Sequence, residues 1–427
     1  MKVLIISHNP ITTYNSMGRT FLGLFSSFNE EELCQLYIYP TIPNIDKCIS
    51  YFRITDKEVL KSILPWNKTG KIINKNDINF DNLLYEKEND SLLYSNKQKH
   101  KIFKLLCRST IWKLGKWYSK NLKQWIINEK PEVIFAAPGL SAFFYNIITK
   151  ISRKFHLPIV LYVCDDFYFS SLNKKSNHIF ENYYYKYLRK KIKNIISLSK
   201  IVVSISKPME KLYAKEFGCN AVTIFSGTTF PFINPDFKII KDVVRYFGNL
   251  KLGRDKSLIE IGIALDKLNT KHNKNYKLEI YSMDNFSSDI SNISCIKHMG
   301  FTESDKLFDL MKSSSLLLHV ESFDYEYLER TKFSISTKIP DILATGIPLL
   351  AYGPKEIASI KHLEENNCAF LVNDANMLLE TLEKALLDKN KRLEVSYLEM
   401  EVAKKFHSNS KQSSLLKKVI INSIDNK

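Results

Sequence analysis

Two kinds of pattern alternate along the chain: short apolar runs bounded by turn residues, and longer segments with apolar residues at helical spacing. The apolar runs of the first half predict buried strands at Val3–Ser7, Gln35–Tyr39, Val133–Ala137, Ile159–Cys164, Ile201–Ser204 and Val222–Phe225. Helical segments separate most of these runs. Such alternation predicts a parallel sheet with helices on both of its faces.

A second alternating set begins after residue 242. It predicts strands at Val243–Phe247, Lys277–Tyr281, Leu316–Val320 and Ile347–Tyr352, with helices at Lys256–Leu268 and Ser304–Lys312. The stretch from Leu393 to Ile424 is predicted to be helical, with a break at His407–Asn409. Residues 228–242, between the two sets, hold two prolines and several aromatic residues without a clear period, which is typical of an interdomain linker.

The two sets predict two domains, because a chain of 427 residues is too long for one ordinary core. We expect an α/β chain with an N-terminal Rossmann-like domain over 1–230 and a linker over 231–242. A second such domain is expected over 243–405, and a C-terminal helix over 406–427 that packs back on the first domain. Ligands of open α/β sheets bind outside the carboxyl ends of the strands, so that edge is the expected ligand site.

The stretch 334–354 is the most informative for chemistry. It predicts a turn into a short helix, a glycine stop at Gly346 and a buried strand. Lys338 and Asp341 are three residues apart, so both fit on one face of the first helical turn. A helix start offers free N–H groups and a positive dipole end to an anion, and a nearby carboxylate can hold a ribose diol. Diphosphate and ribose together indicate a nucleotide ligand.

Several further segments appear in a recognisable order: Val203–Met209 with Phe225–Thr228, Tyr246–Leu250 followed by Arg254–Leu258, His298–Thr302 followed by Ser304–Leu307, and Lys338–Pro348. In this order and at these spacings they resemble the GT-B glycosyltransferases, and among these the family-four-like enzymes of bacterial surface polysaccharide biosynthesis. The resemblance covers nearly the whole chain. It implies a GT-B fold, with two doubly wound Rossmann-like domains facing across a cleft.

The resemblance also implies roles for individual residues. Arg254 and Lys256 would bind the diphosphate, Asp341 would hold the ribose, and Phe301 would lie in the element that lines the base. The other donor-binding residues implied are Gly18, Gly248, Asn249, Gly300, Thr302, Asp324, Ser336, Thr337 and Lys338. Gly18 is expected in a loop after the first strand, where a small residue lets the backbone approach the donor; an ordinary turn is the alternative.

The sequence departs from the family pattern at two places. The family often has two glutamates separated by seven residues; here Asp341 takes the second position, and Phe333 lies eight residues before it. The segment from Glu321 to Arg330 resembles an enlarged version of the loop with the first acid, so Glu321 and Asp324 are both candidates for it. The family also often has a histidine near the donor sugar, and Asp165 is the candidate replacement.

Glycosyl transfer from a nucleotide sugar builds negative charge on the departing diphosphate, and fixed cations stabilise that charge. Arg254 can donate hydrogen bonds to two phosphate oxygens through its planar guanidinium, and Lys256 supplies a point charge. The alternative is that both are solvated charges, although cations at a helix start oppose its dipole unless an anion is present. The alternative role of Asp341 is to cap the helix. The alternative for Glu321 and Asp324 is that they lie in an acidic loop that faces solvent.

Composition and charge restrict the class of protein. Seven cysteines without a C-x-x-C pair argue against disulfides or a zinc site and predict a reducing cytoplasm. No apolar run is long enough to span a bilayer. The net charge of +17 fits an anionic membrane surface, nucleic acid, or a composition that is merely rich in lysine, asparagine and isoleucine. No recognised nucleic-acid-binding module accompanies the cations.

Residues 97–130 combine ten lysines or arginines and one acid with three tryptophans, Trp112, Trp117 and Trp125. On a helical wheel Phe103, Leu106, Leu114, Trp117 and Trp125 share one arc. We expect this arc to pack on the sheet; a helix lying on anionic lipid is the alternative. Tyr183–Tyr187, with the cations that follow, forms a second patch of this kind.

The leading hypothesis is therefore a retaining glycosyltransferase that moves a sugar from a nucleotide-sugar donor to a saccharide or lipid-linked acceptor. The resemblance implies that it would need no metal or cofactor; Asp165 and Asp166, after an apolar strand, could suggest a metal pair, but no third ligand is evident. It would work in the cytoplasm, in contact with the inner face of the membrane, without nucleic acid. The alternatives are a catalytically silent GT-B binding module, a nucleotide-sugar epimerase and a nucleic-acid-binding protein.

Overall fold

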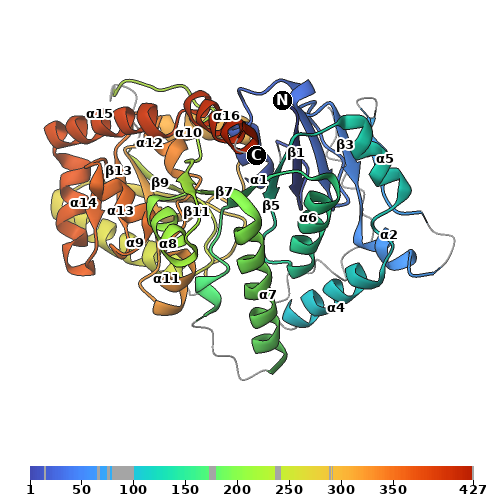
Figure 1. Ribbon diagram of the computed structural model, residues 1–427. Helices are drawn as coiled ribbons and strands as arrows, with labels where there is room; N and C mark the ends of the chain where they lie inside the picture. Colours follow the sequence, from blue (N-terminus) through green and yellow to red (C-terminus); the bar gives the residue numbers. More distant parts are fainter. Residues whose placement is uncertain are drawn as a thin grey trace. The chain divides into compact units, whose positions relative to one another are not determined.

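The computed structural model describes residues 1–13, 16–64, 68–74, 77–78, 101–172, 179–235, 242–287, 290 and 292–425 (Figure 1). These residues form two compact units. The first unit comprises Met1–Ile224 and Ser413–Lys427, and the second comprises Phe225–Gln412. Part of the predicted linker, residues 236–241, and residues 97–100 of the basic segment lie outside the described residues.

The first unit is built on an eight-stranded sheet with the order β4-β3-β2-β1-β5-β6-β7-β8. Its strands are β1 (Val3–Ser7), β2 (Leu33–Tyr37), β3 (Ser50–Arg53), β4 (Lys71–Ile73), β5 (Val133–Ala137), β6 (Ile159–Val163), β7 (Ser199–Ser204) and β8 (Ala221–Thr223). Neighbouring strands are parallel, except that β4 runs antiparallel to β3. Every residue of β1 and β5 is buried, as expected of central strands covered on both faces.

The helices of the first unit connect these strands. They are α1 (Ser16–Leu24), α2 (Asp56–Lys61), α4 (Lys101–Leu114), α5 (Lys120–Glu129), α6 (Ala142–Phe155), α7 (Ile179–Leu198), α8 (Lys207–Phe217) and the C-terminal α16 (Asn409–Asp425). Short 3₁₀ turns lie at Glu30–Glu32 and Phe169–Ser171. The ion pair between Lys417 and Glu32, at 2.7 Å, attaches α16 to the start of β2.

The second unit is built on a six-stranded parallel sheet with the order β11-β10-β9-β12-β13-β14. Its strands are β9 (Val243–Phe247), β10 (Lys277–Tyr281), β11 (Ile296–His298), β12 (Leu316–Val320), β13 (Leu349–Tyr352) and β14 (Phe370–Val372). Numbered within the unit, this order is 3-2-1-4-5-6, the doubly wound Rossmann arrangement. The strand order reverses between β9 and β12, and the crevice at such a point is where these sheets bind ligands.

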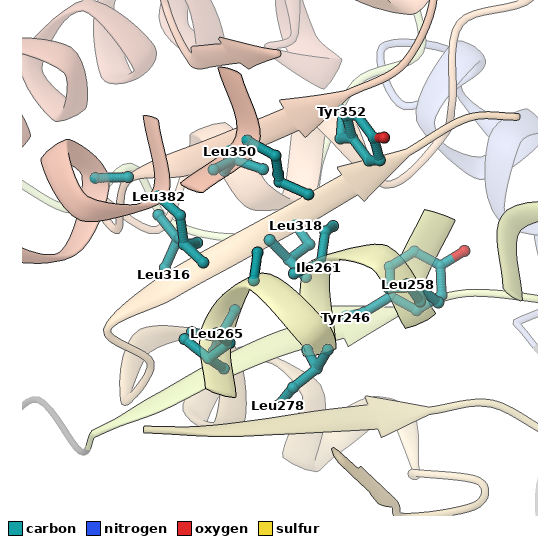
Figure 2. Packing of buried hydrophobic residues seen from close by; sticks show 14 of the residues in the cluster. Tyr246, Leu258, Ile261, Leu265, Leu278, Leu316, Leu318, Leu350, Tyr352 and Leu382 are labelled. Atoms are coloured by element: carbon teal, nitrogen blue, oxygen red, sulfur yellow. The ribbon is translucent and has the colours of Figure 1, made fainter. Parts of the chain in front are cut away.

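The helices of the second unit are α9 (Arg254–His272), α10 (Ser304–Lys312), α11 (Tyr325–Thr331), α12 (Ile339–Leu343), α13 (Ala358–Glu365), α14 (Leu378–Leu387) and α15 (Lys389–Phe406), with a 3₁₀ turn at Ala375–Met377. Leu258, Ile261 and Leu265 of α9 point onto β12 and β10 in a buried cluster (Figure 2). Truncating one such leucine to alanine typically costs about 2–5 kcal/mol, so α9 is firmly fixed on the sheet. Its first residue, Arg254, is therefore held at the carboxyl edge.

The prediction of an α/β chain with two doubly wound domains is confirmed. The prediction of one helix through the basic segment was wrong: α4 and α5 are separate helices with a break over residues 115–119. Gly115 marks that break, where an added Cβ would lie 2.4 Å from Val59. Of the predicted arc, Trp117 and Trp125 are buried, whereas Phe103 and Leu114 are exposed; Trp112, outside that arc, is buried as well. Among the described residues, no helix is long and apolar enough to cross a membrane.

Candidate active site

The loop after β9 approaches the loop after β12 at the point where the strand order reverses. The chain leaves β9 at Phe247 and enters α9 through two residues with positive φ, Leu252 (62°) and Gly253 (73°). A Cβ on Gly253 would lie 2.5 Å from Ser322 Oγ and 2.9 Å from Tyr327 Cδ2. Glycine is required here for both its conformation and this close approach.

Arg254 and Glu321 form an ion pair across this switch point, through a single guanidinium nitrogen. Nη2 of Arg254 donates to Glu321 Oε1 at 3.1 Å and to Oε2 at 3.0 Å, and Nη1 donates to Asn249 Oδ1 at 3.0 Å. The Glu321 side chain is only 4% exposed and that of Arg254 is 14% exposed. The carboxylate therefore fixes one edge of the guanidinium, while the remaining N–H groups stay available to a ligand.

Burial and pairing set the charges in this group. Burial raises the pKa of Glu321, and the positive charge of Arg254 opposes this rise only in part. Burial disfavours the charged Arg254, but the carboxylate of Glu321 outweighs this and raises the pKa of the guanidinium. Burial and the nearby Arg254 lower the pKa of His319 to about 3, so His319 is neutral beside the pair. Its Nε2 lies 3.5 Å from Glu321 Oε1.

Lys256 lies on the outer side of the same helical turn. Its Nζ is 2.9 Å from Asp324 Oδ2, and both side chains are well exposed, at 62% and 47%. An exposed pair of this kind contributes little to stability, so a ligand can displace it at small cost. Asp324 is the residue immediately before α11, which turns the predicted acidic loop into a short helix.

The loop after β9 holds two more predicted residues. Tyr246 donates its hydroxyl proton to the carbonyl of Asn249 at 2.8 Å, which folds the loop back over the strand end. A Cβ on Gly248 would lie 2.6 Å from the same hydroxyl, so the position favours glycine. At the edge of the sheet, Gly300 has a φ of 73° and the following Phe301 is 70% exposed. Thr302 lies next to it, before α10.

Lys338 and Asp341 lie at the start of α12, on the return path from β12 to β13. Lys338 Nζ is 3.9 Å from Asp341 Oδ2, and Thr228 Oγ1 donates to Asp341 Oδ1 at 2.8 Å. Upstream, the Ser336 N–H donates to Ser359 Oγ, and the Lys338 N–H to Ser336 Oγ; Thr337 lies between these two residues. Asp341 thus has a structural role at Thr228 in addition to any role toward a ligand.

The two predicted site residues of the first unit have different surroundings. Asp165 is exposed after β6 and accepts a weak hydrogen bond from Cys164 Sγ at 3.9 Å. It lines a small cavity of about 20 Å³, enough for one water molecule, beside Gly139 and Tyr213. Its neighbour Asp166 is buried and accepts from three backbone N–H groups and the Tyr213 hydroxyl.

Gly18 does not lie in a loop, as we had predicted, but in the first turns of α1. A Cβ there would lie 2.5 Å from the backbone oxygen of Thr12, so this glycine permits close packing of the helix on the preceding turn. His8 is half-buried and neutral: desolvation and the nearby Arg108 lower its pKa to about 4. It stacks on Phe144 at 4.3 Å and contacts the Pro138 carbonyl, which is a structural setting.

The structure brings Asn249, Arg254, Lys256, Glu321 and Asp324 together at the switch point of the second unit. His319 and Tyr246 belong to the same group and were not predicted. Each lies inside an apolar strand, and its contact is with a residue that follows the same strand: Asn249 for Tyr246 and Glu321 for His319. Within the described residues, no three histidine, cysteine, aspartate or glutamate side chains are grouped so that they could hold a metal ion.

Comparison with known proteins shows the fold. No protein-family model matches the sequence, and no curated protein sequence is similar to it. Sucrose-phosphate synthase from Thermosynechococcus elongatus is similar in structure, with a TM-score of 0.62 at 10% identity over all of both chains. HepE from Anabaena, in complex with UDP and glucose, has a TM-score of 0.63 at 11% identity, covering 99% of this chain and 100% of that one.

A third similar structure is WaaG, a glycosyltransferase involved in lipopolysaccharide biosynthesis, with a TM-score of 0.57 at 10% identity. That match covers 97% of this chain and 99% of the other. Together these matches show that the whole chain has the fold of the GT-B glycosyltransferases. At such low identity they establish the fold and leave the activity to be argued from the site.

Proposed function

We propose that this protein is a glycosyltransferase that moves a sugar from a nucleotide-sugar donor to a saccharide or lipid-linked saccharide acceptor. One observation carries the proposal. Arg254 and Lys256 stand in the first turn of α9, at the point of the second sheet where the strand order reverses. That is where a doubly wound sheet of this order binds the phosphates of a nucleotide, and the fold is that of glycosyltransferases.

The positive end of the helix dipole disfavours two cations at the first turn of a helix, and here the carboxylates of Glu321 and Asp324 offset it. An anion bound there would satisfy the dipole, the free N–H groups and both side chains together. Glu321 holds Arg254 so that the unused edge of its guanidinium stays in place. A diphosphate is the anion that two neighbouring cations of this spacing suit best.

The donor is proposed to be a uridine diphosphate sugar, because HepE was obtained with UDP and with UDP-glucose. Asp341 would accept hydrogen bonds from the ribose hydroxyls, in competition with the Thr228 hydroxyl that it now accepts from. Phe301, exposed beside Gly300, offers an apolar face to the base. Gly248 and Asn249 would place their loop against the phosphates.

In the proposed reaction the bond between the anomeric carbon and the diphosphate oxygen breaks, the acceptor hydroxyl oxygen forms the new bond to that carbon, and the hydroxyl proton passes to the departing diphosphate. Negative charge grows on the diphosphate, and Arg254 and Lys256 stabilise it, Lys256 after exchanging Asp324 for a phosphate oxygen. We propose that the two side chains do this in place of a metal ion and that the anomeric configuration is retained. Activity should then persist in excess EDTA, and the product anomer is readable by NMR.

The biological setting is also part of the proposal. WaaG is involved in lipopolysaccharide biosynthesis, which supports a lipid-linked saccharide as the first acceptor class to test. Such acceptors are displayed at the cytoplasmic face of a membrane, so we propose a cytoplasmic protein with peripheral membrane contact. Asp165, exposed at the carboxyl edge of the first sheet, is a candidate contact for sugar hydroxyls.

The test is release of UDP from a panel of UDP-sugars by the purified full-length protein, with and without a lipid-linked saccharide extract. We expect one donor to be consumed only when acceptor is present, and Arg254→Ala to abolish this. Lys251→Ala is the matched control, because Lys251 lies in the same loop but is 71% exposed and pairs with Asp284. Conversion of the donor sugar without acceptor would instead indicate an epimerase, and no turnover with any donor would indicate a silent module.

A further inference from the structure

The N-terminal end of α7 exposes large apolar side chains that the candidate site does not use. Ile179 is 82% exposed, Phe180 is 71% exposed and Tyr183 is 63% exposed. Phe103, in the first turn of the neighbouring α4, is 62% exposed. Side chains of this size are normally buried, and a group of them on a surface marks a contact with something else.

The position of α7 explains why this end stands clear of the sheet. The helix has 20 residues and passes at Leu198 directly into β7, which has six. It is therefore about 30 Å long, against about 20 Å for the strand. Its first turns extend past the carboxyl edge of the first sheet, as Figure 1 shows for the lower end of α7. The Tyr184 hydroxyl, donating to the Leu140 carbonyl at 2.8 Å, fixes the helix just beyond these exposed side chains.

Cations continue the same face of the helix. Ile179, Tyr183, Lys186, Lys190 and Lys193 are separated by four, seven, eleven and fourteen residues from the first, which places them in one stripe. The whole of α7 carries five lysines or arginines and one acid, Glu181, and α4 carries four cations and no acid. Of those cations, Arg108 is paired with buried Asp56, while Lys186, Lys190 and Lys193 are exposed.

We propose that this stripe, together with Phe180 and Phe103, binds the surface of an anionic lipid bilayer. The apolar residues at the tip would enter the interface between head groups and acyl chains, and the lysines behind them would lie against the anionic head groups. The proposal commits to lipid because the charged residues of the stripe are all lysines and the apolar side chains at its tip are exposed. A nucleic acid would match the lysines but not the aliphatic and aromatic tip.

The surface itself follows from exposure and charge alone. Its purpose rests on the proposed function, since a lipid-linked acceptor has to be reached at a membrane. The membrane contact would bring the carboxyl edge of the first sheet toward that acceptor, because the exposed end of α7 projects from the same edge.

The test is sedimentation of the full-length protein with vesicles of phosphatidylcholine, and with vesicles of equal parts phosphatidylcholine and phosphatidylglycerol. We expect binding to the mixed vesicles that falls as salt is added. The triple variant Ile179→Ser/Phe180→Ser/Tyr183→Ser should bind at least about tenfold more weakly. The matched control is Tyr397→Ser/Leu415→Ser/Ile421→Ser, which removes exposed apolar residues of α15 and α16 and should bind as the wild type does.

A second variant, Lys186→Gln/Lys190→Gln/Lys193→Gln, should lose the preference for phosphatidylglycerol. UDP release with the acceptor extract solubilised in detergent, without vesicles, separates this proposal from the proposed function: the α7 variants should retain it. Wild-type protein that stays in the supernatant with the mixed vesicles would overturn the proposal. Equal binding by the α7 triple variant and the control would overturn it as well. Circular dichroism spectra of both variants are recorded first, so that only folded proteins are compared.

Discussion

Glu321→Gln tests whether the buried carboxylate holds Arg254 in place. Removing one member of a buried ion pair typically costs about 3–5 kcal/mol, because the other charge is left buried. Here Arg254 is 14% exposed and keeps its bond to Asn249, and glutamine keeps one acceptor oxygen. We therefore expect a loss of about 2–3 kcal/mol in the free energy of unfolding, which for a unit of this size lowers Tm by about 4–12 °C.

Nucleotide should restore much of this loss. In the variant, the diphosphate of UDP supplies the negative charge that Arg254 has lost, so saturating UDP should raise Tm more than it does in the wild type. Glu279→Gln is the matched control: Glu279 pairs with buried Arg245 at 2.8 Å in the same sheet. It should be destabilised to a similar degree without any extra response to UDP.

The assays are urea unfolding followed by circular dichroism, and thermal unfolding with and without UDP. A double-mutant cycle with Arg254→Met isolates the pair, and we expect a coupling of about 2 kcal/mol. If Glu321→Gln is as stable as the wild type within about 0.5 kcal/mol, or if the two single losses simply add, the ion pair does not hold Arg254 and this reasoning fails.

Three further predictions follow from the same geometry. Gly253→Ala should lower the free energy of unfolding in urea by about 1–3 kcal/mol, since the added Cβ clashes with its neighbours and the backbone has a φ of 73°. Gly218→Ala is the control and should lower it by less, because there is open space at its Cβ. Equal losses would contradict the close approach at Gly253. Asp341→Ala should weaken UDP binding about tenfold or more by calorimetry and leave pyrophosphate binding unchanged, because only the ribose contact is lost; an equal effect on both would refute that role. Burial lowers the pKa of His362 to about 4 and that of His407 to about 3, so the unfolded chain takes up protons first as pH falls below about 6.5. Stability is then greatest above about pH 6.5, and each histidine should lower it by about 1.4 kcal/mol between about pH 7.5 and 5.5. The variant His362→Gln/His407→Gln should lose that share of the pH dependence, and an unchanged slope would contradict it.

The second unit was largely predictable from sequence. The strand β9, the strand β10 and the helix α10 begin and end where their patterns place them, because each is a clear apolar run or amphipathic segment between turn residues. The first unit was harder. The strand β2 covers Leu33–Tyr37, two residues before the predicted start, since the buried polar Gln35 breaks the apolar pattern there. Short strands such as β4 and β14, of three residues each, carry too little pattern to be found.

The site was predictable in its cations and less so in its acids. A helix start with Arg254 and Lys256 after a buried strand already indicates an anion, so the residues themselves carried that signal. The identity of the first acid was open between Glu321 and Asp324, because the sequence cannot tell which carboxylate points inward. The structure separates them by burial: Glu321 meets Arg254 and Asp324 meets Lys256. His319 escaped notice because a lone histidine in a strand is usually a core residue.

A crystal structure of the full-length protein with UDP would test the central claim most directly. Difference density should place the diphosphate at the first turn of α9, within hydrogen-bond distance of the free edge of Arg254, with the Glu321 carboxylate still bound to its other edge. Lys256 should have left Asp324 for a phosphate oxygen. A diphosphate bound away from α9, with both ion pairs intact and no phosphate oxygen near Arg254 or Lys256, would contradict the account.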